Sequence, residues 1–506
     1  MTNVSSPLVA LTALFLLASA IPGAASAQPE APEPASQPER PHILIFLADD
    51  LGWKDVSYHG SEIRTPHIDR IAREGIELDH FYVQPTCSPT RTALMTGKSP
   101  LRLGVTRPVA KHDEEGLPID EVLLPEQLGR LGYQSVMAGK WHLGHYTPDQ
   151  FPHARGFESF KGHVTGGIGY WDHVHGGGYD WQRDGVTLRE EGYSTHLIAD
   201  EAVRLVETRD EERPLFLYVA FNAPHLPNEA PLEALDRYAG IADINRRTHA
   251  GMIDEMDRSI GRVLAAFEAQ GLLENTIVLF SSDNGGIVSG AVAPAPLKIA
   301  TLIRDIFGRP APFASLEFLV ANVFDGGSDN GPLRMGKMSA FEGGARVPAA
   351  IWWPGRLEGR KHDAFMTISD VLPTLLDAVG AVEATPRDLN GRSQWAALSG
   401  AAPAGDFADY VIYGFEGEAL YRAPLKLINT DPPQLYNIMA DPYEEKDLAA
   451  EKPEKVAEMV EALAAWPVGD RNTAGPLSMI LDPDRFGGEE DRAPWAEVAR
   501  ENAENP

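Results

Sequence analysis

The only cysteine of the chain, Cys87, lies in a polar stretch next to a cation. A single cysteine cannot form an intramolecular disulfide, so its thiol serves either packing or chemistry. A buried structural cysteine normally lies in an apolar run, whereas Thr86 and Ser88 flank this one, and Pro89 and Arg91 follow shortly after. This setting indicates chemistry. The alternative interpretation is an inert thiol in a proline-containing loop.

Two acidic turns supply candidate metal ligands. Asp49 and Asp50 directly follow an apolar run of strand length, and Asp283 and Asn284 follow a second such run. Adjacent carboxylates at the end of a buried strand repel one another, and a divalent cation holds both ionised. Ligands gather at the carboxyl ends of neighbouring strands in open α/β sheets, so we expect the two turns to meet in one site. Carboxylate and amide oxygens suit Ca²⁺ or Mg²⁺ and not zinc.

A lysine and a histidine two residues apart follow a third strand pattern. The run over residues 133–138 leads into Gly139-Lys140-Trp141-His142. Side chains two apart on an extended segment point the same way, and a glycine lets the backbone approach a ligand. Most lysines and histidines lie on solvated surfaces, and the chain has 15 histidines. The spacing and the position after a strand favour a functional role for Lys140 and His142.

These motifs resemble those of the type I sulfatases. Cys87-x-Pro89-x-Arg91 is similar to the first half of that family's signature, and residues 92–104 fit the second half in register. The sequence of residues 139–144 resembles the family's Gly-Lys-Trp-His-Leu-Gly element. Within the family the chain most resembles the branch containing arylsulfatase B, an N-acetylgalactosamine-4-sulfatase. The resemblance implies that a maturase oxidises Cys87 to formylglycine after translation.

The resemblance also implies one calcium ion. Its implied ligands are Asp49, Asp50, Asp283, Asn284 and the modified Cys87. The hydrate of the formylglycine aldehyde offers one hydroxyl to attack sulfur and a second whose deprotonation expels sulfate. The implied reaction is therefore hydrolysis of a sulfate monoester, with the cation polarising a sulfuryl oxygen.

Basic residues complete the implied site. Lys337 follows Arg334 in a segment that resembles a second lysine element of the family, although Met335 stands where glycine is common. The resemblance makes Lys140 and Lys337 the sulfate-binding lysines and His225 a substrate-contacting histidine. The neighbouring Asp329-Asn330 repeats the composition of the metal turns, but no strand pattern directly precedes it, and we interpret it as unrelated to the metal.

The resemblance assigns the proton transfers as well. It implies that Arg91 steadies the formylglycine, that Asp283 accepts the proton of the attacking hydroxyl, that His225 with Lys337 protonates the leaving oxygen, and that His142 is the base that regenerates the aldehyde.

Alternating strand and helix patterns must position these residues. Apolar runs at residues 42–48, 214–221 and 275–282 predict strands buried on both faces, and residues 65–75 predict a helix with Thr65 as N-cap. We predict an α/β fold with a large, mostly parallel mixed sheet flanked by helices, which is alkaline phosphatase-like by resemblance. Short strand patterns after residue 410 predict a smaller C-terminal α+β domain with an antiparallel sheet.

The predicted organisation has five parts. They are a signal peptide at 1–27, a disordered linker at 28–40, a catalytic domain at 41–385 with a helical insertion at 287–328, a C-terminal subdomain at 386–466 and an acidic tail at 467–506. The leader predicts export to a periplasm or secretion, although no Lys or Arg precedes its apolar run. We interpret the insertion as a helical hairpin that covers the site or forms a subunit contact.

Composition limits the partners. The 506-residue chain has 73 acidic and 44 basic residues, a formal charge of −29, which argues against binding nucleic acid or an anionic membrane. No stable membrane anchor is predicted. The oligomeric state is left open.

The expected substrate is a sulfated small molecule or glycan, and its alcohol is left open. Trp171, His173 and His175 lie in a long loop and line a sugar site in one interpretation, while the alternative is a loop held together by aromatic packing. Two other functions remain: hydrolysis of phosphate or phosphonate esters by the same metal site, and a catalytically inactive, glycan-binding relative with an unmodified Cys87.

Overall fold

A ten-stranded mixed sheet organises the computed structural model, which describes residues 40–175, 178–288, 325–405, 407–469 and 495. Five adjacent strands at its centre run parallel: β11 (Thr276–Ser282), β1 (His42–Ala48), β10 (Leu215–Ala220), β4 (Gln134–Lys140) and β5 (Ser159–His163). The edges are β12 (Ala349–Trp352), β2 (Ile76–Leu78) and β13 (Arg360–His362) on one side, and β8 (Gln182–Arg183) and β9 (Val186–Thr187) on the other. The carboxyl ends of the parallel strands therefore share one edge, where the predicted site residues follow.

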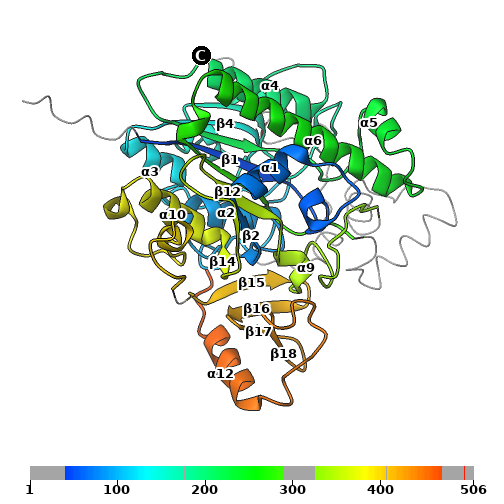
Figure 1. The fold of residues 1–506 in the computed structure, drawn as a ribbon, viewed down its shortest axis with the longest axis vertical. Helices are drawn as coiled ribbons and strands as arrows, with labels where there is room; N and C mark the ends of the chain where they lie inside the picture. The colour runs from blue at the N-terminus through cyan, green and yellow to red at the C-terminus, as the bar shows by residue number, and fades with distance from the viewer. Residues whose placement is uncertain (1–39, 176–177, 289–324, 406, 470–494, 496–506) are drawn as a thin grey trace, which may run out of the picture. The chain divides into compact units, whose positions relative to one another are not determined.

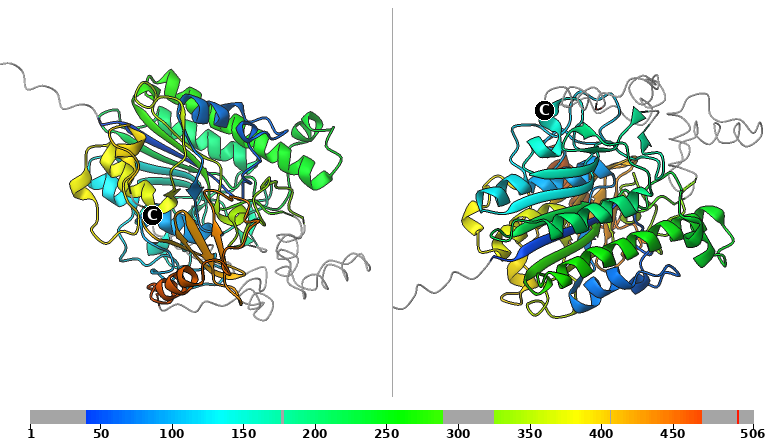
Figure 2. Two further views of the ribbon diagram at one scale, coloured as in Figure 1. Left: turned by 60° about the horizontal axis from the view of Figure 1, so that its bottom comes forward. Right: turned by 90° about the horizontal axis from the view of Figure 1, so that it is seen from above.

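Both faces of the sheet are buried under helices (Figures 1 and 2). Alternate residues of β1 belong to two separate apolar clusters, which explains why its sequence is apolar throughout. One cluster includes helices α1 (Pro66–Glu74), α4 (Ser194–Glu207) and α6 (Ile244–Ala269). The other includes α2 (Cys87–Thr96), α3 (Leu124–Arg130) and α10 (Val371–Ala378).

A second, four-stranded antiparallel sheet follows in sequence order. Its strands are β15 (Tyr410–Gly414), β16 (Gly417–Arg422), β17 (Leu425–Ile428) and β18 (Gln434–Asn437), and helix α12 (Pro453–Ala464) packs on it. The predicted fold class is confirmed in both of its parts. The remaining elements are β3 (Phe81–Tyr82), β14 (Met366–Thr367), β6 (Val174–His175), β7 (Gly178–Tyr179), α5 (Leu232–Arg237), α9 (Glu342–Ala345), α11 (Trp395–Leu398) and short 3-10 helices at Ser57–His59, Pro148–Gln150, Pro152–Ala154, Leu273–Asn275, Ile368–Asp370 and Val382–Ala384.

The cysteine stretch differs from the sequence expectation, because α2 is a helix that begins at Cys87 and not a loop. Pro89 fits in its first turn, where backbone N–H groups have no acceptor within the helix. Gly97 ends the helix with a positive φ of 67°, and its N–H donates to the carbonyl of Ala93. The helix fixes Cys87 and Arg91 on one buried element. Thr65 precedes α1 as expected, but its hydroxyl donates to Asp69 and does not cap the helix.

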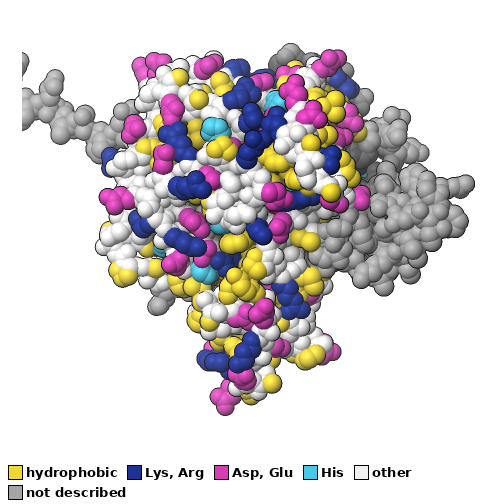
Figure 3. Space-filling view, turned by 45° about the vertical axis from the view of Figure 1, so that its right-hand side comes forward, with side chains coloured by type: hydrophobic (Ala, Val, Ile, Leu, Met, Phe, Trp, Pro, Cys, Tyr) yellow, Lys and Arg dark blue, Asp and Glu magenta, His cyan; other side chains and the backbone are white. Residues whose placement is uncertain are grey.

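Several predicted segments lie outside the described residues. They are the leader, nearly all of the linker, most of the 287–328 insertion and most of the acidic tail. Within the described part of the chain, no helix has the length and apolar character needed to cross a membrane. The face in Figure 3 carries acidic and basic side chains interspersed.

Candidate active site

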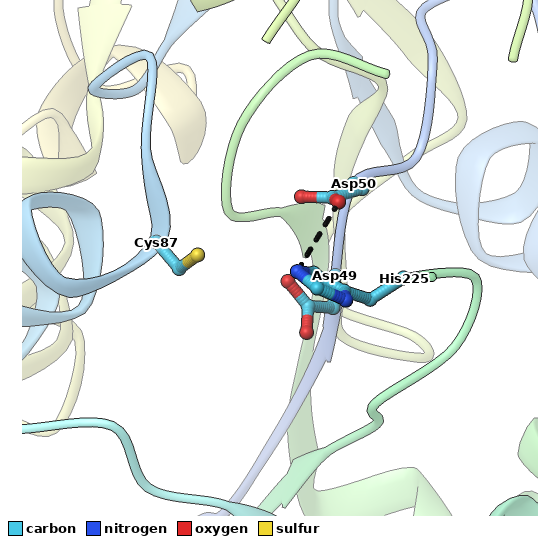
Figure 4. A group of neighbouring side chains, drawn as sticks. All are labelled: Asp49, Asp50, Cys87 and His225. Atoms are coloured by element: carbon cyan, nitrogen blue, oxygen red, sulfur yellow. Dashed lines mark ion pairs between the residues drawn. The ribbon is translucent and has the colours of Figure 1, made fainter. Parts of the chain in front are cut away.

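Four buried side chains converge at the carboxyl edge of the large sheet. Asp49 and Asp50 follow β1, Cys87 starts α2 and His225 follows β10, and one potential ligand atom of each lies within 4.8 Å of those of the others. Figure 4 shows the thiol of Cys87 directed toward the two carboxylates and the imidazole. Residues separated by almost 180 positions therefore form one group that has the composition of a metal site.

Two oxygens at this site are suited to a cation. Oδ1 of Asp49 and Oδ1 of Asn284 are buried and accept no hydrogen bond from any described residue. Asn284 follows β11, and its amide nitrogen donates to Oδ1 of Asp50 at 2.7 Å, which fixes the orientation of its free oxygen. Buried polar atoms are normally paired, and unpaired carboxylate and amide oxygens are the ligands that a hard cation prefers.

The charges around these carboxylates support the same conclusion. Burial, together with the negative charges of Asp283 and Asp50, raises the pKa of Asp49 well above its ordinary value. A bound divalent cation would reverse this effect by stabilising the ionised form. Asp50 differs: burial opposes its ionisation, but Lys337 and the other basic neighbours together outweigh burial and lower its pKa. The donor set fits calcium or magnesium.

Asp283 contacts both Arg91 and the turn that contains Asp49 and Asp50. Its Oδ2 accepts hydrogen bonds from Nε and Nη2 of Arg91 at 3.0 and 2.7 Å, and both side chains are fully buried. Its Oδ1 faces the backbone N–H of Asp50 at 3.3 Å. Arg91 also donates to the carbonyl of Lys140 at 2.9 Å. Arg91 thus connects α2, β4 and the turn after β11. Because Arg91 occupies Oδ2 of Asp283, Oδ1 is the oxygen that faces the turn of Asp49 and Asp50.

Each of the two predicted sulfate-binding lysines pairs with one carboxylate. Nζ of Lys140 lies 2.6 Å from Oδ2 of Asp49, and Nζ of Lys337 lies 2.8 Å from Oδ2 of Asp50. Burial disfavours the ammonium of Lys337, but Asp50 and the other acidic neighbours together outweigh burial and raise its pKa. Two buried cations thus lie next to the metal turn, in a chain whose net charge is strongly negative. With a divalent cation balancing the carboxylates, an anion at this point would meet a local excess of positive charge.

His142 forms a hydrogen bond through one ring nitrogen only, as far as the described residues show. Its Nε2 pairs with the carbonyl of Val109 at 3.1 Å, so that nitrogen carries the proton, and its buried Nδ1 has no partner among the described residues. Burial, followed by the charges of Lys140 and Arg91, lowers the pKa of His142 well below its ordinary value. The imidazole is therefore neutral, with a lone pair available at Nδ1.

His225 joins the group from the opposite side. Its Nδ1 pairs with the carbonyl of Leu226 at 2.6 Å, and its Nε2 lies 3.6 Å from Oδ2 of Asp50. Burial and the charge of Lys337 lower its pKa. Sequence reasoning gave His225 a substrate contact and no metal contact, whereas the geometry also brings it within reach of the ion's position.

The thiol of Cys87 is not activated by its surroundings. Burial raises its pKa to about 11, despite the nearby charges of Lys140 and Lys337. A thiol protonated at neutral pH is a weak nucleophile and a weak metal ligand. The unmodified side chain is therefore poorly suited to the chemistry that its position indicates.

The loop with the candidate sugar-site residues is mostly structural. His173 is buried and stacks on Trp181 with ring centroids 4.8 Å apart. His175 packs against Trp495, the one described residue of the acidic tail beyond 469, which is itself buried. Trp171 differs, because its side chain is 51% exposed. Aromatic packing therefore accounts for His173 and His175, and Trp171 alone faces solvent.

Two groups near the site were missed by sequence reasoning. His163, at the end of β5, is fully buried next to Lys140. The turn at Asp329 and Asn330 lies outside the metal group, as interpreted from the sequence, but it has a bracing role: Oδ1 of Asn330 accepts from the N–H of Gly286 at 3.0 Å. The glycine before His163, which repeats the glycine before Lys140, is the signal that could have found it.

A buried ionic cluster attaches the segment with Lys337 to the small sheet. Nζ of Lys426 on β17 lies 3.0 Å from Oε1 of Glu342 and 2.7 Å from Oε1 of Glu444, and the three side chains are buried. The hydroxyl of Tyr82 donates to Oε2 of Glu342 at 2.8 Å. Glu342 lies five residues after Lys337, so the small sheet helps to hold a lysine of the site.

Comparison with known proteins defines the class. The sulfatase family matches residues 41–381, which is most of the chain, and the chain therefore belongs to the sulfatase family.

Individual relatives agree with this assignment. Mouse arylsulfatase J is 34% identical over 370 residues, covering 71% of this chain and 56% of that protein. Dog N-acetylgalactosamine-6-sulfatase is 32% identical over 415 residues, covering 77% of this chain and 71% of that protein. The chain thus spans little more than half the length of mouse arylsulfatase J. The crystal structure of Ps i-CgsB is similar with a TM-score of 0.72 and 28% identity, covering 85% of this chain and 93% of that one.

Proposed function

We propose that this protein hydrolyses sulfate monoesters of a sugar or aryl alcohol. The observation that carries the proposal is the convergence of Cys87 with two buried carboxylates, each paired with a buried lysine. Membership of the sulfatase family supports the same reaction. The phosphate-ester and inactive-relative alternatives have no separate observation in their favour, and they are outcomes of the test below.

The residues present fit the groups that this reaction needs. Asp49, Asp50, Asp283 and Asn284, together with the side chain at position 87, would hold a calcium ion. A formylglycine hydrate at position 87 with this ion would supply a hydroxyl that attacks sulfur and a second hydroxyl whose deprotonation releases sulfate. The weakly acidic thiol of unmodified Cys87 supports the need for such a replacement.

Side chains of this protein bind and orient the ester. The ammonium groups of Lys140 and Lys337 donate hydrogen bonds to the sulfate oxygens. Arg91 fixes the position of α2 through its hydrogen bonds to Asp283. These groups are held in place before substrate binds, because each is already paired with a buried acceptor. Preorganised charges of this kind contribute several kcal/mol to stabilisation of the transition state.

Proton transfers fall to three further groups. Oδ1 of Asp283 is placed to take the proton of the attacking hydroxyl, since Oδ2 is occupied by Arg91. His225 serves the leaving oxygen together with Lys337, whose raised pKa keeps the ammonium that delivers the proton, because Nδ1 of His225 holds that ring's own proton. Nδ1 of His142 holds the free lone pair needed to take a proton from the second hydroxyl.

A sulfated sugar is the proposed substrate class. A solved structure of Ps i-CgsB contains k-i-k-neocarrahexaose, and that chain is 27% identical with a TM-score of 0.73. Mammalian relatives are named for N-acetylgalactosamine-6-sulfate chemistry. We further propose that the protein is exported, by the leader at 1–27, after its maturase has acted on Cys87.

The test combines mass spectrometry with kinetics. Protein produced with a formylglycine-generating maturase should show the Cys87 peptide with loss of H₂S and gain of O, and should cleave 4-nitrophenyl sulfate. Faster cleavage of the matching phosphate monoester or diester would favour the phosphate-ester alternative. Free thiol and no turnover, despite an active maturase, would favour the inactive relative.

A further inference from the structure

His163 is a buried, unpaired imidazole next to the site. Its side chain is 0% exposed, and neither Nδ1 nor Nε2 has a hydrogen-bond partner among the described residues. An unpaired polar group costs about 1–3 kcal/mol when it is buried, so folded proteins seldom keep one without a use. The metal ligands, sulfate contacts and proton transfers proposed above make no use of this residue.

Strand pairing places His163 beside Lys140. In the parallel pair of β4 and β5, Gly139 is opposite Gly162 and Lys140 is opposite His163. Register partners in parallel strands direct their side chains to the same face of a sheet. A Cβ on Gly162 would lie 2.0 Å from the carbonyl oxygen of Gly139, so β5 approaches β4 this closely because residue 162 is a glycine. Gly139 has the same role on the other side of β4, where its Cβ would lie 1.9 Å from the carbonyl oxygen of Ala220. A glycine thus directly precedes both Lys140 and His163 where neighbouring strands approach closely.

The segment after His163 forms a wall of the site. A Cβ on Gly166 would lie 2.8 Å from the ring of His142, and one on Gly167 would lie 2.8 Å from the ring of His225. Buried Asp180 fixes this segment, because it accepts hydrogen bonds from the backbone N–H groups of Val164 and Thr165. His163 is thus held rigidly where the segment begins, in contact range of whatever lies against Lys140.

The position of His163 and the hydrogen-bonding capacity of its ring indicate which part of the substrate it contacts. The strand order β1-β10-β4-β5 places His163 beyond Lys140, on the side away from Asp49 and the metal turn. The segment that begins at His163 reaches His142 and His225 through Gly166 and Gly167, so an alcohol whose oxygen is protonated beside His225 extends along this segment toward His163. The pKa of His163 is lowered by burial and by Lys140 and Arg91, so the ring is neutral, with one N–H donor and one acceptor nitrogen.

We propose that His163 recognises a hydroxyl group on the carbon next to the sulfated one. A hydroxyl can donate to the bare ring nitrogen or accept from the ring N–H, so it suits whichever nitrogen faces the substrate, whereas a second sulfate can only accept and an ammonium can only donate. This inference rests on the proposed sulfatase function and refines its substrate class to monosulfated vicinal diols, as found in sugar rings.

A matched pair of substrates tests this assignment. 2-Hydroxyphenyl sulfate differs from phenyl sulfate only by the neighbouring hydroxyl, and sulfate release from both is measured by ion chromatography. The intrinsic difference in leaving group is the same for every variant, so the ratio of the two kcat/KM values isolates the contact with the enzyme. His163→Leu should lower this ratio about 3- to 10-fold, while His163→Asn, which keeps a donor and an acceptor, should stay near wild type. His153→Asn, which changes a histidine outside the site, is the control.

Binding to the Cys87→Ala variant separates this inference from the proposed function. Titration calorimetry with the two sulfates gives a ratio of dissociation constants that needs no turnover, so the test remains valid if the wild-type protein is inactive. An unchanged ratio in His163→Leu, an equal loss on both substrates, or no binding of either would overturn the proposal. His163→Phe repeats the test if the leucine variant does not fold, as judged by its melting curve.

Discussion

Nζ of Lys337 lies 2.8 Å from Oδ2 of Asp50. This ion pair joins a predicted sulfate-binding lysine to a predicted metal ligand in the turn after β1. The two residues are 287 positions apart in the chain, and both are buried. Removal of either partner leaves an uncompensated charge in a low-dielectric environment, so the pair is sensitive to substitution.

Replacement of Lys337 should separate catalysis from metal binding. We expect Lys337→Met to lower kcat for 4-nitrophenyl sulfate by about 10²- to 10³-fold, because one stabilising cation is lost. Calcium affinity, measured by titration calorimetry, should be unchanged or tighter, since a neighbouring positive charge is removed. Loss of calcium binding in this variant would show that Lys337 serves to build the metal site.

Removal of the metal should weaken the fold locally. A chelator leaves the buried carboxylates of Asp49 and Asp50 without a counter-ion, so the melting temperature should fall. At a calcium concentration of about 100 times Kd, the ion contributes about 2.7 kcal/mol. Asn284→Leu should abolish this calcium-dependent stabilisation, because it removes an unpaired oxygen of the site. Asp329→Asn, in a turn of the same composition outside the metal group, should behave like wild type.

Acid should destabilise the protein through His42, which is remote from the metal turn. Burial lowers the pKa of His42 from 6.5 to about 4, and its Nδ1 accepts a hydrogen bond from the N–H of Leu215 at 2.9 Å. Above pH 6.5 both folded and unfolded states hold it neutral. Between pH 6.5 and 4 only the unfolded state takes up the proton, so the free energy of unfolding falls as pH falls, by about 3 kcal/mol from this group.

His42→Asn tests this effect, because its amide oxygen can accept the same hydrogen bond without titrating. Urea unfolding of both proteins between pH 4.5 and 7.5 should show a weaker pH dependence in the variant. Parallel curves would mean that His42 does not titrate on unfolding in this range.

The ionic cluster at Lys426 should be essential to stability. Lys426→Met leaves two buried carboxylates without their cation and should lower the free energy of unfolding by about 3–5 kcal/mol. Adding Glu342→Gln and Glu444→Gln should recover part of this loss, because the isolated charges are then gone. Lys455→Met, which breaks an exposed ion pair with Glu458, should have no measurable effect on urea unfolding. A cost no larger than that of the control would contradict the argument.

Local sequence patterns predicted much of the framework. The apolar run of β1 and the turn that follows it are both local signals, and so are the glycines around Lys140. They predicted the parallel sheet and the edge at which the site residues meet. Helix α2 was not predicted, because Pro89 and the polar residues around Cys87 are typical of loops, and tertiary packing decides their conformation.

Contacts across long sequence distances were beyond local patterns. The pairing of Lys426 with Glu342 joins residues 84 positions apart, and no pattern around either residue indicates the other as its partner. The unpaired state of His163 depends on how β5 is buried, which no single sequence reports. The resemblance to a family supplied the roles of the residues in the motifs. The structure added residues outside those motifs, such as His163 and Lys426.

The small sheet also determines where a recombinant fragment of this protein can end. The family match ends at residue 381, yet Glu342, inside it, is neutralised by Lys426, outside it. A recombinant fragment that stopped at the family boundary would leave Glu342 without its cation and expose the apolar side chains on which the small sheet packs, so it would be prone to aggregation. Expression plasmids and chimeric enzymes built from this protein should therefore extend past β18.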